Sequence, residues 1–114
     1  MPAPIQPSAT FKETLSYLPS IEGVERVDLV DARGTIVATI ENQPGKQGSL
    51  AVYQYLKQQF GKLDAEGAEA GLALFGEHVE DARSRPGAHP NIDRLIEIAE
   101  GGESLAIEVV ARQG

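Results

Sequence analysis

The apolar residues of this chain recur with two different periods, and each period predicts a different kind of element. Val27 and Leu29 alternate with Arg26 and Asp28, and after Asp31-Ala32-Arg33-Gly34 a second alternating run places Ile36, Ala38 and Ile40 on one side. Alternation with a period of two predicts β-strands, and a glycine at the end of a four-residue turn supplies the positive φ that tight turns use. We predict an antiparallel β-hairpin.

The rest of the chain has one more alternating segment and several segments with helical spacing. Residues 104–112 alternate and predict a third strand. Apolar residues three and four positions apart mark the helices, which are predicted at residues 10–18, 49–61, 65–82 and 90–100. The order α-β-β-α-α-α-β predicts an α+β fold, in which a small sheet made of the hairpin and the C-terminal strand packs against about four helices.

The helix boundaries are set by a few residues with strong local preferences. Pro86 lacks the backbone N–H that a helix interior requires, and with Gly87 it ends the helix 65–82. Proline suits the first helical turn, so the next helix begins at His89-Pro90. Ser49 is predicted to cap the helix 49–61, because its hydroxyl can accept a hydrogen bond from a free N–H.

Length and composition restrict the class of protein. With 114 residues the chain is expected to form a single domain over residues 1–114, in which the proline-rich residues 1–7 are a flexible N-terminal tail. It contains no cysteine, which excludes disulfides, thiolate metal sites and cysteine nucleophiles. Neither a signal peptide nor a membrane-spanning run is present, so we expect a cytoplasmic protein that has no membrane partner.

Charge and surface pattern restrict the partners. The net charge of −7 repels phosphate backbones, which argues against nucleic acid. A three-stranded sheet has two unpaired edges, and Val30, Val37 and Val110 are available on its second face. We therefore expect self-association, as a homodimer, or a protein partner.

Both histidines lie near the boundary between two predicted helices, each with an aspartate nearby. His78 and Asp81 are three positions apart on one helix, and His89 and Asp93 flank the start of the next. Imidazole and carboxylate groups bind divalent metals and carry protons in catalysis. The same histidines also suit a structural role at a packed helix corner. We expect no cofactor, and a divalent metal is the alternative.

A second candidate site lies in the loop before the helix 49–61. Lys46, Gly48 and Ser49 bring a cation, flexible backbone and a hydroxyl to a helix N-terminus, where free N–H groups and the helix dipole favour an anion. The segment does not match the Walker pattern, which needs G-x-x-x-x-G-K-[ST] in that order. A plain loop with a helix cap is the alternative interpretation.

Two further sets of residues suggest close packing or ion pairing. Gly67 and Gly71 are one turn apart on the helix 65–82, which indicates a close approach by a neighbouring helix or by a ligand. Arg83, Arg85 and Arg94 flank the Pro-Gly turn near several acids. They are predicted to order this turn through ion pairs, or alternatively to clamp an anionic ligand.

Three segments of the chain resemble an uncharacterised bacterial family known as domain of unknown function 2322. They read LPSIEGVERVDLVDARGTIVATI, PGKQGSLAVY and EHVEDARSRPGAHPNIDRL, and PGxHPNIDRL is the most specific stretch. The resemblance covers most of the chain. It implies a bacterial protein and supplies no activity.

The sequence leaves the function unknown and two classes open. It contains no Walker loop, dinucleotide fingerprint or Ser-His-Asp motif, so we favour a non-catalytic binding or assembly module. The alternative is a small hydrolase or lyase, with or without a metal, that uses four residues: His78, His89, Asp81 and Asp93.

Overall fold

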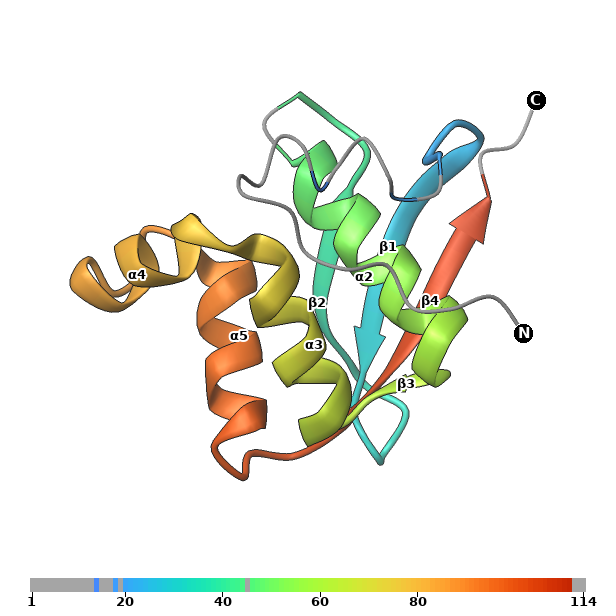
Figure 1. Cartoon of the computed structure of the whole chain (residues 1–114). Helices are drawn as coiled ribbons and strands as arrows, with labels where there is room; N and C mark the ends of the chain where they lie inside the picture. The colour runs from blue at the N-terminus through green and yellow to red at the C-terminus, as the bar shows by residue number, and fades with distance from the viewer. Residues whose placement is uncertain (1–13, 15–17, 19, 45, 112–114) are drawn as a thin grey trace.

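The computed structural model describes residues 14, 18, 20–44 and 46–111 (Figure 1). The tail predicted at residues 1–7 and most of the helix predicted at residues 10–18 lie outside the described residues. Within the described part the elements follow the order β-β-α-β-α-α-α-β. The predicted α+β fold is confirmed.

Four strands form one antiparallel sheet in the order β2-β1-β4-β3. They are β1 (Val24–Val30), β2 (Ile36–Glu41), β3 (Lys62–Leu63) and β4 (Leu105–Ala111). The predicted hairpin and the predicted C-terminal strand are both present, and β4 pairs with β1. The sequence analysis missed β3, because a strand of two residues is too short to show a period.

Asp31 holds the hairpin turn. Its Oδ1 accepts hydrogen bonds from the N–H groups of Arg33, at 2.9 Å, and Thr35, at 3.0 Å. These bonds lower the pKa of the Asp31 carboxyl, with the backbone N–H of Thr35 as the largest cause. Gly34 adopts a φ of 85°, as the turn pattern predicted.

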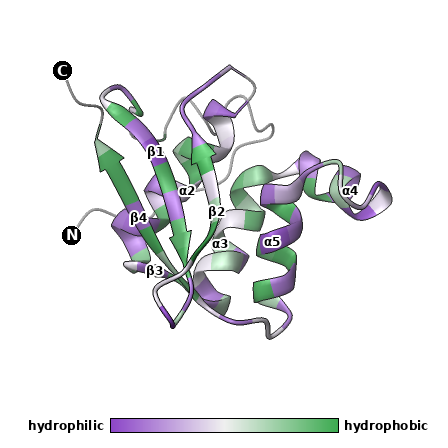
Figure 2. Ribbon diagram, turned by 180° about the vertical axis from the view of Figure 1, so that it is seen from behind, coloured by the Kyte–Doolittle hydropathy of each residue, from purple (hydrophilic) through white to green (hydrophobic). Residues whose placement is uncertain are grey.

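The helices cover one face of the sheet. They are α2 (Gln47–Phe60), α3 (Ala65–Phe75), α4 (Glu77–Ser84) and α5 (Pro90–Ala99). Figures 1 and 2 show α2 against the sheet, with α3 and α5 side by side and α4 beyond them. In the view from behind, no described helix lies over the second face of the sheet. No helix in the described part is long and apolar enough to cross a membrane.

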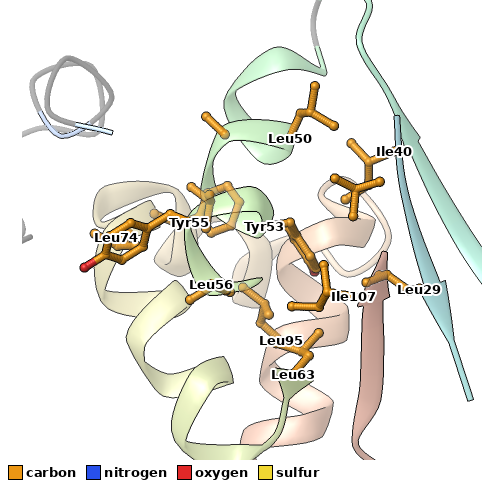
Figure 3. Close-up of a cluster of buried hydrophobic side chains, with 14 of the residues drawn as sticks. Leu29, Ile40, Leu50, Tyr53, Tyr55, Leu56, Leu63, Leu74, Leu95 and Ile107 are labelled. Carbon is orange, nitrogen blue, oxygen red and sulfur yellow. The ribbon is translucent and has the colours of Figure 1, made fainter. Parts of the chain in front are cut away.

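Helix α2 is the centre of the core. Every residue from Leu50 to Leu56 is buried, so this helix is enclosed on several sides and not along a single stripe. Figure 3 shows its side chains packed between residues of the strands and residues of α3 and α5. The sequence predicted a single apolar stripe here, because it could not show that a second layer of helices covers α2.

The single helix predicted at residues 65–82 is wrong. The structure has two helices, α3 and α4, separated at Gly76, which adopts φ 58° and ψ −122°. L-residues rarely adopt this conformation, so the glycine permits the chain to turn there. The apolar spacing continues across the break, which is why the pattern predicted one helix. As a result, His78 does not share a helix with Gly67 and Gly71.

Candidate functional site

A pocket of about 660 Å³ lies where the first turns of α2 and α5 approach the beginning of α4. In Figure 1 both helices begin at their upper ends, and α4 lies to the left of them. The volume falls in the range of pockets that hold small molecules. The lining residues are Lys46, Gln47, Gly48, Ser49, Phe75, His78, Ala88, His89, Pro90, Asn91 and Ile92.

This pocket joins two regions that the sequence analysis treated as separate candidate sites. The segment with Lys46, Gly48 and Ser49 forms one wall, and the two histidines belong to the other. They are far apart in the sequence, so no local pattern could have predicted that they meet. The pocket is therefore a product of how α2 packs beside α5.

The α2 wall presents the uncapped end of a helix. Lys46 occupies the N-cap position, and no side chain there accepts a hydrogen bond from the first turn. Ser49 was predicted to be the cap, but the helix begins two residues earlier, at Gln47, so that prediction is wrong. The N–H groups of a first helical turn have no partner within the helix, and together with the dipole they favour a negative charge.

The α5 wall presents a second helix start. His89 is at the N-cap position and Pro90 at the first helical position, as predicted, and no side chain caps this end either. Asp93 instead closes the preceding turn, because its Oδ2 accepts a hydrogen bond of 2.9 Å from the N–H of Gly87. Two helix N-termini therefore face the same pocket.

The two histidine rings lie close together at this pocket. Their centroids are 6.1 Å apart and their planes are tilted by 45°. The Nε2 atom of His89 lies 2.5 Å from Oδ2 of Asp81, which also forms an ion pair with Arg85. Hydrogen bonds from Arg85 first and His89 second hold the pKa of Asp81 well below its usual range. Asp81 is therefore ionised at neutral pH and orients the His89 ring.

The predicted four-residue site is only partly assembled. His78 and His89 line the pocket, whereas Asp81 contacts Arg85 and His89, and Asp93 holds the turn. Among the described residues there is no group of three or more side chains suited to binding a metal. None of the aspartates and glutamates in the described ranges lines the pocket. Among the described lining residues, Lys46 carries the one permanent charge, and it is positive.

The three arginines near the Pro-Gly turn do not form one cluster. Arg85 pairs with Asp81, as the sequence analysis allowed, but Arg83 lies 3.9 Å from Oε2 of Glu100. None of the three lines the pocket, so they do not form a joint clamp there. Arg94 serves a different contact.

Arg94 and Tyr53 tie α2 to the first turn of α5. The Tyr53 hydroxyl donates a hydrogen bond of 2.6 Å to the Asn91 carbonyl oxygen and accepts one of 3.2 Å from Arg94. Arg94 also donates to Asn91 Oδ1, at 2.9 Å. Burial raises the pKa of Tyr53 to about 12, so the hydroxyl keeps its proton. These bonds fix the distance between the two walls of the pocket.

The comparison with protein families identifies the chain's relatives. A family model described as "Uncharacterized protein conserved in bacteria (DUF2322)" matches residues 11–109. The chain belongs to this family. The resemblance seen in the sequence is thereby confirmed. The search of curated proteins and the search of solved structures found no match for it.

In this DUF2322 protein the two helix glycines mark a packed contact. A Cβ on Gly71 would lie 2.9 Å from Cδ1 of Leu95 and 3.0 Å from Cδ1 of Leu56. A Cβ on Gly67 would lie 3.3 Å from the carbonyl oxygen of Lys62. The sequence left open whether a neighbouring helix or a ligand approaches these glycines. In the structure, neighbouring protein atoms lie at both positions.

Several pocket residues were not recognised as site residues from the sequence. Phe75 and Ile92 belong to the apolar spacing that predicted the helices 65–82 and 90–100, which places them in the core. Both side chains are indeed in the core, since each is 3% exposed. A residue that belongs to the core and also borders a cavity has no separate signal in the sequence.

Proposed function

We propose that this DUF2322 protein is a non-catalytic binding module whose pocket holds a small anionic ligand, through a phosphate or carboxylate group. The observation that carries the proposal is the convergence of two uncapped helix N-termini and Lys46 on one pocket that no described carboxylate lines. On a chain of net charge −7, a pocket without acids is a local exception. A fixed set of N–H donors and a nearby cation suit an anion.

The same geometry supports binding over hydrolysis. A hydrolase of the kind considered from the sequence would need Asp81 or Asp93 near a reacting atom or a metal. Each carboxylate already has partners: Asp81 contacts Arg85 and His89, and Asp93 contacts the Gly87 N–H. His89 lines the pocket, and its contact with Asp81 sets the orientation of its ring.

The test is an NMR titration of the amide resonances with inorganic phosphate, against sodium chloride at matched ionic strength. Phosphate is expected to shift the amides of Gln47, Gly48, Ser49 and Asn91 along saturable curves. Absence of saturable shifts at these four amides would overturn the proposal.

The Lys46 side chain provides the matched variant. Lys46→Ala is expected to weaken phosphate binding about fivefold, since one charge-assisted contact contributes roughly 1 kcal/mol or more. Lys62→Ala is the control, because Lys62 is exposed on β3 and does not line the pocket. Equal loss in both variants would show a general effect of charge and would count against a built site.

We also propose self-association through the edge of β2, as a second role that a separate observation favours. β2 is a terminal strand of the described sheet, and it presents Ile36 at 54% exposure and Val37 at 51%. It contains neither lysine nor proline, the residues that commonly protect a sheet edge. The opposite edge is the two-residue β3, which carries Lys62.

Light scattering at several protein concentrations tests this role. The expected result is a particle with twice the mass of one chain, formed by antiparallel pairing of two β2 edges. Val37→Lys is expected to give monomers, whereas Ala73→Lys, at an exposed position on α3, leaves the dimer intact. A wild-type protein that is monomeric at all concentrations would rule this role out.

A further inference from the structure

We infer that the ligand of the pocket is an amphiphilic anion, in which a phosphate or carboxylate group is attached to a short apolar body, and that the apolar end enters first. The inference rests on the proposed function and adds the class of ligand to it. Its basis is the order of exposure among the residues that line the pocket.

The deepest part of the pocket is apolar. Phe75, at the end of α3, and Ile92, in the first turn of α5, both line the pocket and are each only 3% exposed. They are the only buried residues among those that line the pocket, so we place them at its inner end, as its floor. Water above such a floor has no hydrogen-bond partner below it, so an apolar group that replaces the water gains affinity.

The polar groups lie nearer to the opening. His78, His89, Ser49 and Asn91 are half-buried, and Lys46 is exposed at the rim. An anion at this level would meet the first-turn N–H groups of α2 and the Lys46 ammonium while its apolar body reached the floor. The apolar side chains of Ala88 and Pro90, which are exposed, continue the apolar surface to the rim.

The size of the pocket agrees with this arrangement. An ion as small as phosphate would fill only a small part of about 660 Å³ and would leave most of the pocket to water. A ligand with both parts would use the apolar floor and the polar upper ring together. Such a division between an apolar lining and a few placed polar groups is typical of small-molecule sites.

Three probes separate this inference from the proposed function: inorganic phosphate, phenyl phosphate and phenol. Each is titrated into the full chain, with amide shifts reporting the helix N-termini and the methyl resonance of Ile92 reporting the floor. Ile98, buried on the same helix but outside the pocket lining, is the matched control methyl. Phenyl phosphate is expected to bind about tenfold or more tightly than phosphate, which corresponds to about 1.4 kcal/mol. Phenyl phosphate is also expected to shift the Ile92 methyl resonance, whereas inorganic phosphate is not.

Each other outcome has a defined meaning. If phosphate and phenyl phosphate bind equally and the Ile92 methyl does not move, the amphiphilic ligand is wrong and anion binding stands. If neither anion shifts the amides of α2, both proposals fail. If phenol binds as tightly as phenyl phosphate, the pocket does not select an anion, and both proposals fail again. Ile92→Val, which keeps an apolar floor, should fold and weaken phenyl phosphate more than phosphate.

Discussion

Two regions where the helices of this protein meet, one around Gly71 and one around His89, are packed in opposite ways. Around Gly71 the side chains of Leu56 and Leu95, both fully buried, approach until no space is left for a Cβ. Around His89, at the start of α5 and near the end of α3, the junction is left open and encloses a pocket of about 660 Å³. The first junction is closed by shape alone, and the second is bordered by histidines, a lysine and helix N-termini.

The difference shows which junction serves stability. Close packing gains dispersion contacts and hides apolar surface, whereas an open polar cavity forfeits both. At Gly71 the helices α3 and α5 pack so closely that a Cβ would not fit, whereas near His89 the same chain leaves a pocket. This contrast supports a binding role for the open junction, and the following predictions test it.

Leu95→Ala should have the largest effect on stability. The side chain is fully buried against α3, and its removal leaves a cavity that rigid neighbours cannot fill. The free energy of unfolding is expected to fall by about 2 to 5 kcal/mol, measured by urea denaturation. Ala88→Gly, at the exposed rim of the pocket, is the comparison and should change it far less. Similar losses of unfolding free energy in the two variants would show that the two regions do not differ in their contribution to stability.

Gly71→Val should have the second-largest effect on the free energy of unfolding. Its Cβ would lie within 3.0 Å of Leu56, and the added methyl groups would force further displacement in a filled core. We expect a loss of about 1 to 3 kcal/mol. The matched control is Ala73→Val, two residues away on the exposed side of the same helix, which carries only the smaller helix-propensity cost of valine. Equal effects would mean that the glycine is not needed for close approach.

Tyr53→Phe should cost about 1 to 2 kcal/mol, because it removes one hydrogen bond to Asn91 and one from Arg94. The fold should persist, since the ring itself still fills the core. A double-mutant cycle with Arg94→Gln measures how much of the loss belongs to this pair. Additive losses would show that the two side chains do not act together in tying α2 to α5.

Asp81→Asn should have the smallest effect, and the effect should depend on pH. Arg85 and His89 lower the pKa of Asp81 in the folded state, so its ionised form adds stability above the ordinary aspartate pKa. That contribution disappears as pH falls through the lowered pKa. The difference between the urea midpoints of variant and wild type should therefore be largest at about pH 7 and should shrink steadily as the pH is lowered from about 4 to about 2.

The exposed Glu80, on the same helix, provides the control for this titration. Glu80→Gln should leave the urea midpoint close to that of the wild type at both pH values. A difference for Asp81→Asn that stayed constant with pH would contradict the ion pair as its cause.

The elements near the candidate site were largely predictable, but their assembly was not. The start of α5 at His89-Pro90 follows from the fixed φ of proline, and the end of α2 at Gly61 follows from its left-handed conformation. The Asp81–Arg85 ion pair, four positions apart, is also local. In contrast, the contact of Asp81 with His89 depends on how α4 and α5 pack against each other. The break at Gly76, where α4 begins, was hidden by the continuous apolar spacing.

What the sequence by itself determined is therefore local: the hairpin with its Asp31–Gly34 turn, the C-terminal strand, the starts and ends of most helices, and the family. These depend on backbone preferences and side-chain alternation within about ten residues. Only the tertiary structure decided that α2 is enclosed, that Gly71 receives leucines from two helices, and that Lys46 and the histidines border one pocket. Such contacts join residues far apart in the chain, and their geometry is set by the packing of all the helices at once.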